Sequence, residues 1–407
     1  MGGILFLAHR VPFPPDRGDR IRAHHLLAAL ARVGLVHVGC FTDGESDEAR
    51  AALADIAASH CIAARTKPLP LAGIEAVLTG KPVSLTAFRS RRLASWVQET
   101  IAAQDIDAIV VFSGQMGQYI PDSFTGRVVI DLCDVDSAKF EGYAAAGERV
   151  WINAREARLL TREEERLGRR ADATILISKA EAALYRSRLS DPAGINVEVI
   201  GNGIDAGFFD PATSVPHPEM ARRKGPHFVF TGQMDYRPNE QAALWVIESL
   251  VPVLRARLPG AMFHVVGRNP TAKLVAHHGS PGVHVWGEVP DVRPFLAAAD
   301  AVLAPLLIAR GVQNKVLEAM AMAKPVVLTH EAATGIAADD SAHWLVCPPD
   351  PVQMAARIEF LLSDSEAAAR IGAAARRFVL DCHDWEAMLS PLARLLGRNT
   401  GGQRHAA

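Results

Sequence analysis

The stretch AVLAPLLIARGVQNKVLEAMAMAKPVVLT, residues 301–329, decides the fold. It joins two short apolar runs, AVLAP (301–305) and PVVLT (325–329), through a polar loop and a helix that we expect to start near Lys315. A strand, a loop, a helix and a second strand in this order form one unit of a parallel sheet. The stretch therefore predicts an α/β fold. Ligand sites are expected in the loops that follow the strands, outside the carboxyl ends of the sheet.

The same alternation runs along the rest of the chain in two series. Before residue 205 the expected strands are 4–8, 36–41, 108–112, 127–132, 173–178 and 197–201. After residue 225 they are 227–232, 263–267, 283–287, 301–305, 325–329 and 343–347. We therefore expect two Rossmann-like, doubly wound domains that face each other across a crevice. The expected bounds are 1–204 for the N-terminal domain, 205–225 for a linker, 226–380 for the C-terminal domain, 381–397 for a helix that packs back on the first domain, and 398–407 for a disordered tail.

Composition excludes several classes of protein. The 407 residues include 43 basic and 45 acidic side chains, a net charge of -2 that provides no overall attraction to nucleic acid. The five cysteines are an odd number and form no Cys-x-x-Cys pair, which favours a reducing cytoplasm over a disulfide framework or a zinc site. No apolar stretch reaches the length of a membrane-spanning helix, so any membrane contact is expected to be peripheral.

The loop and helix start at 306–318 have the features of a phosphate site. Gly311 permits close backbone approach, the free N–H groups at the helix start favour an anion, and Lys315 adds a positive charge. Glu318, one turn later, is placed where a carboxylate could accept hydrogen bonds from ribose hydroxyls. An ordinary capped helix with a solvated Lys315 explains the spacing equally well.

Several segments together resemble glycosyltransferase family 4, whose members are retaining enzymes of the two-Rossmann GT-B architecture. The resemblance is carried, in the family's order, by VEVIGNGIDAGFFDP (197–211), FTGQMDYRPNEQAALWV (230–246), HVVG (264–267), WGEVPDVRPFLAAADAVLAPL (286–306) and GVQNKVLEAMAMAKPVV (311–327). Within the family, HRVPFPPDRGDRIRAHHLL (9–27) and DLCDVDSAKF (131–140) are similar to sugar transferases associated with exosortase/PEP-CTERM systems, which are tied to exopolysaccharide production.

The resemblance implies roles for residues of the second domain. Glu318 would contact the donor ribose, while Arg310 stands where the family commonly has a first glutamate, so Arg310 would contact phosphate or be a solvated charge. Gly232 and Arg237 follow the first strand of this domain, and Asn239 is expected to cap the helix that comes next. Arg237 is the only base of that loop, and together with Lys315 it would neutralise the departing diphosphate.

In the first domain the resemblance gives Gly18 close approach to the donor phosphates. Asp16, Arg17 and Asp19 would then line the acceptor or phosphate side, although a long surface turn explains the same charges.

DLCDVDS (131–137) begins at the end of an expected strand and supplies the candidate catalytic base. Asp134 is the first candidate and Asp131 the second, since a carboxylate there could take the proton of the acceptor hydroxyl. The rival interpretation is that Asp134 and Asp136 form a D-x-D metal site. Basic residues and helix N-termini make a metal unnecessary for charge neutralisation, so we expect no metal and no cofactor beyond the donor substrate.

The sequence thus predicts a cytoplasmic hexosyltransferase of EC class 2.4 that moves a sugar from a nucleoside diphosphate to a saccharide or lipid-linked acceptor, with retention. The basic segment FRSRRLASW (88–96) could meet anionic lipid at the inner face of a membrane. Two alternatives stay open. One is a sugar-nucleotide epimerase of the same fold, and the other is a nucleotide-binding, non-catalytic component of a polysaccharide assembly system.

Overall fold

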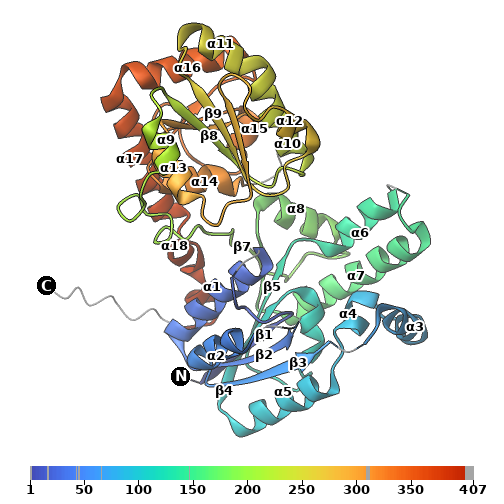
Figure 1. Cartoon of the computed structure of the whole chain (residues 1–407). Coiled ribbons are helices and arrows are strands. Elements are labelled where there is room, and N and C mark those ends of the chain that lie inside the picture. Colours follow the sequence, from blue (N-terminus) through green and yellow to red (C-terminus); the bar gives the residue numbers. More distant parts are fainter. Residues whose placement is uncertain are drawn as a thin grey trace, which may run out of the picture. The chain divides into compact units, whose positions relative to one another are not determined.

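The computed structural model describes residues 2–15, 18–42, 44, 46–65, 67–145, 147–308 and 312–398. The chain forms two compact units, one of Met1–Asn202 with Met388–Ala407 and one of Gly203–Ala387. In each unit helices surround a parallel sheet (Figure 1). Within the described ranges, no helix combines the length and the apolar character that crossing a membrane requires.

The first unit is built on a seven-stranded parallel sheet. Its strand order is β3-β2-β1-β4-β5-β6-β7. The strands are β1 (Gly3–Ala8), β2 (Val36–Thr42), β3 (Ser59–Ala64), β4 (Ile106–Phe112), β5 (Arg127–Cys133), β6 (Ala173–Leu176) and β7 (Val197–Val199). The helices are α1 (Gly18–Val33), α2 (Asp47–Ile56), α3 (Leu69–Thr79), α4 (Val83–Ala87), α5 (Arg91–Ala103), the 3-10 helix η1 (Gly114–Tyr119), α6 (Asp136–Ala145), α7 (Val150–Arg170), α8 (Lys179–Arg188) and α19 (Pro391–Leu395), with α18 (Trp385–Leu389) at the border of the units.

The second unit repeats this plan with six parallel strands in the order β10-β9-β8-β11-β12-β13. The strands are β8 (His227–Thr231), β9 (Met262–Val266), β10 (Val283–Gly287), β11 (Ala301–Ala304), β12 (Val326–Leu328) and β13 (Leu345–Val346). The helices are α9 (Pro218–Arg222), α10 (Arg237–Trp245), the π-helix η2 (Val246–Leu250), α11 (Val251–Arg257), α12 (Ala272–Ala276), α13 (Arg293–Ala298), α14 (Asn314–Ala321), α15 (His330–Ala333), α16 (Pro351–Ser363) and α17 (Ser365–Cys382).

Both sheets follow the doubly wound strand order that the α/β alternation predicts. The order in which successive strands are added reverses once in each sheet, between β1 and β4 in the first unit and between β8 and β11 in the second. A sheet of this kind opens a ligand crevice at the carboxyl ends of the two strands that flank the reversal. The loops after β8 and β11 in the second unit, and those after β1 and β4 in the first, are therefore the places where a site is expected.

The cores explain why these segments fold as strands. Residues Ile4 to Ala8 of β1 are fully buried, as is Phe230 of β8, so the runs are apolar on both faces. Parallel strands covered by helices on both faces require this continuous pattern. The apolar runs that the sequence shows are thus the central strands of two separate cores.

Three predicted boundaries are corrected by the structure. The segment 205–225 belongs to the second unit, because it contains α9 with its buried Met220, and His217 stacks on Phe295 with ring centroids 4.3 Å apart. The predicted C-terminal helix at 381–397 is split into the end of α17, α18 and α19, and α19 packs on α1.

The predicted tail begins one residue too early, because Arg398 is anchored in the first unit. Its guanidinium donates to the backbone oxygens of Val33 and Gly2, both at 2.8 Å, and pairs with Asp107. The remaining tail, 399–407, lies outside the described residues.

Candidate functional site

Two glycines shape the carboxyl edge of the second sheet. A Cβ atom added to Gly232, which follows β8, would lie 2.8 Å from Nδ2 of Asn239 and 3.1 Å from Nζ of Lys315. A Cβ on Gly267, which follows β9, would lie 1.7 Å from the backbone oxygen of Gly232. Both glycines have positive φ, +152° and +153°, which side chains rarely adopt. Glycine at these positions lets the Lys315 ammonium reach the end of β8 at the reversal point.

Lys315 is the second residue of α14 and points toward the loop after β8. Its ammonium donates to Oδ1 of Asn239 and lies 4.7 Å from the centroid of the Phe230 ring. Burial lowers the pKa of Lys315 to about 8, against the opposing attraction of Glu318. A cation that is already partly desolvated and held by a neutral amide is well prepared to receive an anion.

Asn239 has a different role from the helix cap that the sequence suggests. The residue that caps α10 is Tyr236, and Asn239 is buried two positions inside the helix. Its Nδ2 donates to the backbone oxygen of Gln233 at 2.9 Å while its Oδ1 receives the Lys315 ammonium. Asn239 therefore ties the loop after β8 to α14.

Glu318 lies one turn after Lys315 on the same helix. Burial raises its pKa to about 7, and Lys315 only partly counteracts this. The flanking residues Leu317 and Ala319 are buried in the core, so the two charged residues share the remaining face of α14. Among the described residues the Glu318 carboxylate accepts no hydrogen bond and forms no ion pair. The half-buried Glu318 carboxylate therefore has no hydrogen-bond donor among the described residues, as is expected of a carboxylate that binds a ligand.

Exposed guanidinium groups lie on the two loops next to this pair. Arg237, predicted from the sequence, is the first residue of α10, and its side chain is exposed. Arg268, which sequence analysis missed, follows β9 and donates to Oε1 of Gln233 at 2.9 Å. The backbone N–H of Met234 donates to the oxygen of Arg268 at 2.9 Å, so the two loops are joined. A basic residue within two positions of the end of a strand is the sequence signal that could have identified Arg268.

Two predicted donor-site residues, Arg310 and Gly311, lie outside the described residues. The chain leading to them leaves β11 through Leu306, whose backbone oxygen accepts from Thr329 at 2.6 Å. Ile308, the last residue described before the gap, is 61% exposed.

The segment 286–306, one of those that carry the family resemblance, begins with a packed tryptophan. Nε1 of Trp286 donates to Nδ1 of His264 at 3.1 Å, and the His284 ring stacks on the indole with centroids 4.0 Å apart. The other ring nitrogen of His264 is 2.9 Å from Nδ1 of His227. Burial, and then the charge of His227, lowers the pKa of His264 to about 3. The imidazole is therefore neutral and fixes the Trp286 ring in place.

In the first unit the structure corrects the role of Asp131. The carboxylate is fully buried; its Oδ2 accepts from Nε of Arg22 at 2.8 Å and its Oδ1 from the N–H of Cys133 at 3.0 Å. Arg22, itself buried, also donates to the backbone oxygens of Ile200 and Gly201. Asp131 holds the ends of β5 and β7 together through Arg22 and is not accessible to an acceptor.

Asp134, the other candidate base, is exposed at the carboxyl end of β5. The preceding residue, Cys133, has φ +67°, and this turn carries the chain from the strand into the loop. Within the part of the chain described, the Asp134 carboxylate has no hydrogen-bond or ion-pair partner. Asp136 is half-buried at the start of α6, and burial raises its pKa, opposed by Lys139. No three carboxylate, His or Cys side chains among the described residues are grouped to hold a metal ion.

The loop after β1 contributes a second polar group in this unit. Asp19, at the start of α1, accepts from Nε2 of His9 at 3.2 Å and from the guanidinium of Arg10 at 2.5 Å. Burial alone would raise the pKa of Asp19, but these two donors hold it well below its usual range. His9 was not predicted, although a titratable residue directly after a strand is a usable signal. Its Nδ1 is buried and has no partner in the described structure.

The other residues predicted for this loop are Gly18, Asp16 and Arg17. Gly18 is the first residue of α1, and a Cβ added there would meet nothing within 4 Å in the described structure. The protein's own packing therefore does not require glycine at this position. Asp16 and Arg17 lie outside the described residues.

One family model matches part of the second unit. Residues 225–364 match the model of the family described as Glycosyl transferases group 1. The segment lies in the second unit and includes Gly232, Lys315 and Glu318. No curated protein matches the chain.

Solved structures share the fold over nearly the whole chain. A sucrose-phosphate synthase from Thermosynechococcus elongatus is 19% identical, with 97% of this chain and 98% of that chain covered and a TM-score of 0.61. HepE from Anabaena, in complex with UDP, is 16% identical, with 97% and 99% covered and a TM-score of 0.63. WaaG, a glycosyltransferase involved in lipopolysaccharide biosynthesis, is 18% identical, with 98% and 100% covered and a TM-score of 0.60. The chain therefore has the GT-B fold, which confirms the predicted α/β class.

Proposed function

We propose that the protein is a retaining glycosyltransferase of the family 4 type that takes a sugar from a nucleoside diphosphate donor. One observation carries the proposal. A partly desolvated lysine, Lys315, and a carboxylate that is unpaired among the described residues, Glu318, lie on one helix beside Gly232, at the reversal point of a doubly wound sheet. The same segment matches a family of glycosyl transferases.

The donor would bind to groups of the second unit. Its diphosphate would replace the Asn239 amide as the partner of the Lys315 ammonium, with the start of α14 and the guanidinium of Arg237 contributing further positive charge. Glu318 would accept hydrogen bonds from the ribose hydroxyls. These cations would stabilise the negative charge that forms on the diphosphate as the sugar departs, so no metal is needed.

The acceptor would meet groups of the first unit. Its hydroxyl oxygen would form the new bond to the anomeric carbon on the face from which the diphosphate departs, so that the configuration is retained as the bond from that carbon to the diphosphate breaks. The hydroxyl proton would pass to Asp134 or to the departing diphosphate. Support for Asp134 is its exposure and the lack of a partner for its carboxylate within the described ranges, whereas Asp131 is closed to substrate by Arg22.

The nucleotide, the acceptor and the cellular site are proposed from the similarity of this chain to other proteins. UDP is the nucleotide to test first, because HepE of the same fold was crystallised with UDP. A saccharide or lipid-linked acceptor in exopolysaccharide synthesis follows from the resemblance of 9–27 and 131–140 to PEP-CTERM-associated transferases. A cytoplasmic site is part of the same proposal.

Turnover of nucleotide sugars tests the proposal. The purified protein would be incubated with UDP-, GDP- and ADP-sugars and a saccharide acceptor panel, without added metal, and the released nucleoside diphosphate measured. We expect release with one nucleotide, and loss of release in Lys315→Met. Lys273→Met removes an exposed lysine of the same unit and should leave turnover unchanged.

Other outcomes would count against transfer. Interconversion of the nucleotide sugar without release of nucleotide would indicate an epimerase. Tight binding with neither reaction would indicate the non-catalytic alternative. Inversion at the anomeric carbon, visible by NMR of the product, would contradict the retaining assignment.

A further inference from the structure

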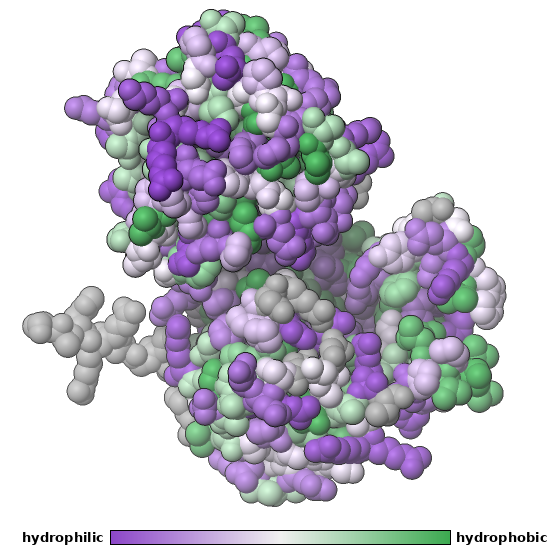
Figure 2. Space-filling view, in the orientation of Figure 1, coloured by the Kyte–Doolittle hydropathy of each residue, from purple (hydrophilic) through white to green (hydrophobic). Residues whose placement is uncertain are grey.

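Helix α3 of the first unit presents its large apolar side chains to solvent. Leu78 is 81% exposed, and Trp151 at the start of the neighbouring helix α7 is 71% exposed. The surface over α3 is the green area at the right of the first unit in Figure 2. We define the apolar face as the exposed residues Leu71, Ile74, Val77, Leu78, Trp151 and Ile152. All but Leu71 also line one shallow groove of about 420 Å³. A helix that covers a core normally shows the opposite arrangement.

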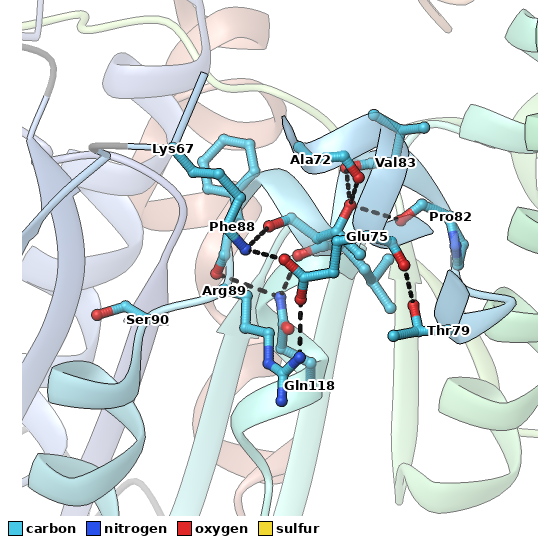
Figure 3. A network of polar contacts seen from close by, with 12 residues as sticks. Lys67, Ala72, Glu75, Thr79, Pro82, Val83, Phe88, Arg89, Ser90 and Gln118 are labelled. Carbon is cyan, nitrogen blue, oxygen red and sulfur yellow. Dashed lines mark hydrogen bonds and ion pairs between the residues drawn. The ribbon is translucent and has the colours of Figure 1, made fainter. Parts of the chain in front are cut away.

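The inner side of α3 is held by small residues and polar contacts. Ala72 and Ala76 are fully buried, and Oγ1 of Thr86 donates to the backbone oxygen of Ala72 at 2.8 Å. Figure 3 shows Glu75 between Lys67 and Arg89, both of which donate to its carboxylate. The leucines of α3 are therefore not needed to attach the helix. They stay exposed while the helix is firmly fixed.

The start of α7 is fixed to the same surface. The guanidinium of Arg155 donates to the backbone oxygen of Ala76 at 2.6 Å and to that of Lys81 at 3.3 Å. Glu156 points inward and accepts from the N–H groups of Val83 and Ser84, both at 2.8 Å, at the start of α4. The two helices thus present one preformed apolar surface.

Free charge around the apolar face is mainly positive. Lys81 follows α3, Arg149 precedes α7 and Arg158 lies on α7; all three are exposed, and in the described structure their side chains have no hydrogen-bond or ion-pair partner. The nearby carboxylates are occupied, since Glu75 is paired with two cations and Glu156 caps α4. Glu148 is the exposed exception. This local excess contrasts with the net charge of -2 of the whole chain.

We propose that the apolar face inserts into the interface of a lipid bilayer that carries anionic headgroups. Leucine and isoleucine would enter the acyl boundary, Trp151 would lie at headgroup level, and Lys81, Arg149 and Arg158 would contact lipid phosphates. A second copy of the chain is a poorer partner, because pairing this face with itself would bring like charges together. The inference does not depend on the proposed glycosyl transfer. If that function holds, the face would hold the enzyme at a surface where a lipid-linked acceptor is present.

The sequence offered a different segment, 88–96, as one that could contact anionic lipid. In the structure Phe88 of that segment is buried and Ser90 caps helix α5 with its side chain, so the segment lacks the exposed apolar side chains that α3 presents. The apolar face on α3 and α7 could not be located from the sequence, since its leucines resemble those of a core helix.

Co-sedimentation of the full chain with vesicles tests the proposal. Vesicles of phosphatidylcholine alone would be compared with vesicles of phosphatidylcholine and phosphatidylglycerol. We expect binding to the anionic vesicles that weakens as salt is raised, and a further loss of about tenfold in Leu78→Asp, which places a charge where an apolar contact is expected. Leu35→Asp, at an isolated leucine that is 70% exposed in the same unit, is the matched control and should bind like the parent.

Both substituted side chains are exposed, so both variants should fold, and equal melting temperatures would verify this. The triple variant Lys81→Gln, Arg149→Gln and Arg158→Gln should lose the preference for anionic vesicles. The proposal is overturned if the parent stays in the supernatant with both vesicle types, or if Leu78→Asp and Leu35→Asp bind equally. A dimer in solution that Leu78→Asp dissociates, without vesicle binding, would assign the face to a second copy instead.

Discussion

Each unit places a cation and a carboxylate near the carboxyl edge of its sheet, but the two pairs are in opposite states. Arg22 and Asp131 are 1% and 0% exposed and form a buried ion pair, and the other donors of Arg22 bind two backbone oxygens and Oδ1 of Asn202. Lys315 and Glu318 are half-buried, and Glu318 has no hydrogen-bond donor in the described structure. Arg22 and Asp131, the closed pair, have all their partners within the protein. Lys315 and Glu318, the open pair, can still bind a ligand, and this difference separates a structural pair from a functional one.

The largest effect is expected from breaking the closed pair. Asp131→Ala leaves the Arg22 guanidinium buried without its counter-charge and should lower the free energy of unfolding by about 3–5 kcal/mol. Chemical denaturation followed by circular dichroism measures this. Asp134→Ala, at an exposed residue three positions further along the chain, should change stability by no more than roughly 0.5 kcal/mol. Equal effects of the two substitutions would contradict the structural role of Asp131.

Removing the open pair should affect ligand binding more than stability. Lys315→Met deletes a partly desolvated charge, so the melting temperature of the free protein should stay the same or rise. Affinity for the nucleoside diphosphate should fall roughly 10- to 100-fold, the range for loss of a hydrogen bond to a charged group. Calorimetric titration gives both values. Loss of stability without loss of affinity would place Lys315 with the structural pair.

A side chain at Gly232 should disturb the open pair indirectly. Gly232→Ala combines an unfavourable φ with a Cβ only 3.1 Å from the Lys315 ammonium, and should cost roughly 1–3 kcal/mol. Thermal unfolding with and without nucleotide measures the loss of both stability and binding. Gly142→Ala in α6, where a Cβ meets nothing within 4 Å in the described structure, should raise stability by roughly 0.5–1 kcal/mol.

The smallest effect is a pH dependence that only the open pair should show. Nucleotide affinity should fall above pH 8, where Lys315 with its pKa of about 8 loses its proton, by up to about tenfold per pH unit. The free energy of unfolding should change with pH in the opposite direction to the nucleotide affinity. The lysine pKa is lower in the folded than in the unfolded chain, so the unfolded chain binds more protons there and stability rises with pH above 8. Lys315→Met should remove both trends, and persistence of either would assign it to another group.

The sequence predicted the strands well because parallel strands are uniformly apolar. The expected runs at 4–8 and 227–232 correspond to β1 and β8, and the helix expected near Lys315 begins at Asn314. Strand β3 was missed, since SHCIAA has a single β-branched residue and lies at the edge of the sheet.

The site was less predictable, because its chemistry depends on partners distant in sequence. Arg22 and Asp131 are 109 positions apart, and a strand-end aspartate looks the same in sequence whether it is paired or free. Asn239 and Lys315 are 76 positions apart, so the local pattern indicated a cap where the structure shows a link between loop and helix. The sequence singled out Gly232, Lys315 and Glu318 as candidates because a glycine, a cation and a carboxylate stand in the loops and the helix start that follow two strands.

The most direct test of the central claim is a calorimetric titration with UDP, GDP and ADP of the parent, Glu318→Gln, Lys315→Met and the control Lys273→Met. The account predicts that one nucleotide binds the parent and the control with the same affinity, and that the two variants of the open pair bind it at least roughly tenfold more weakly. If no nucleotide binds the parent, or if all four proteins bind alike, the open pair on α14 is not the donor site.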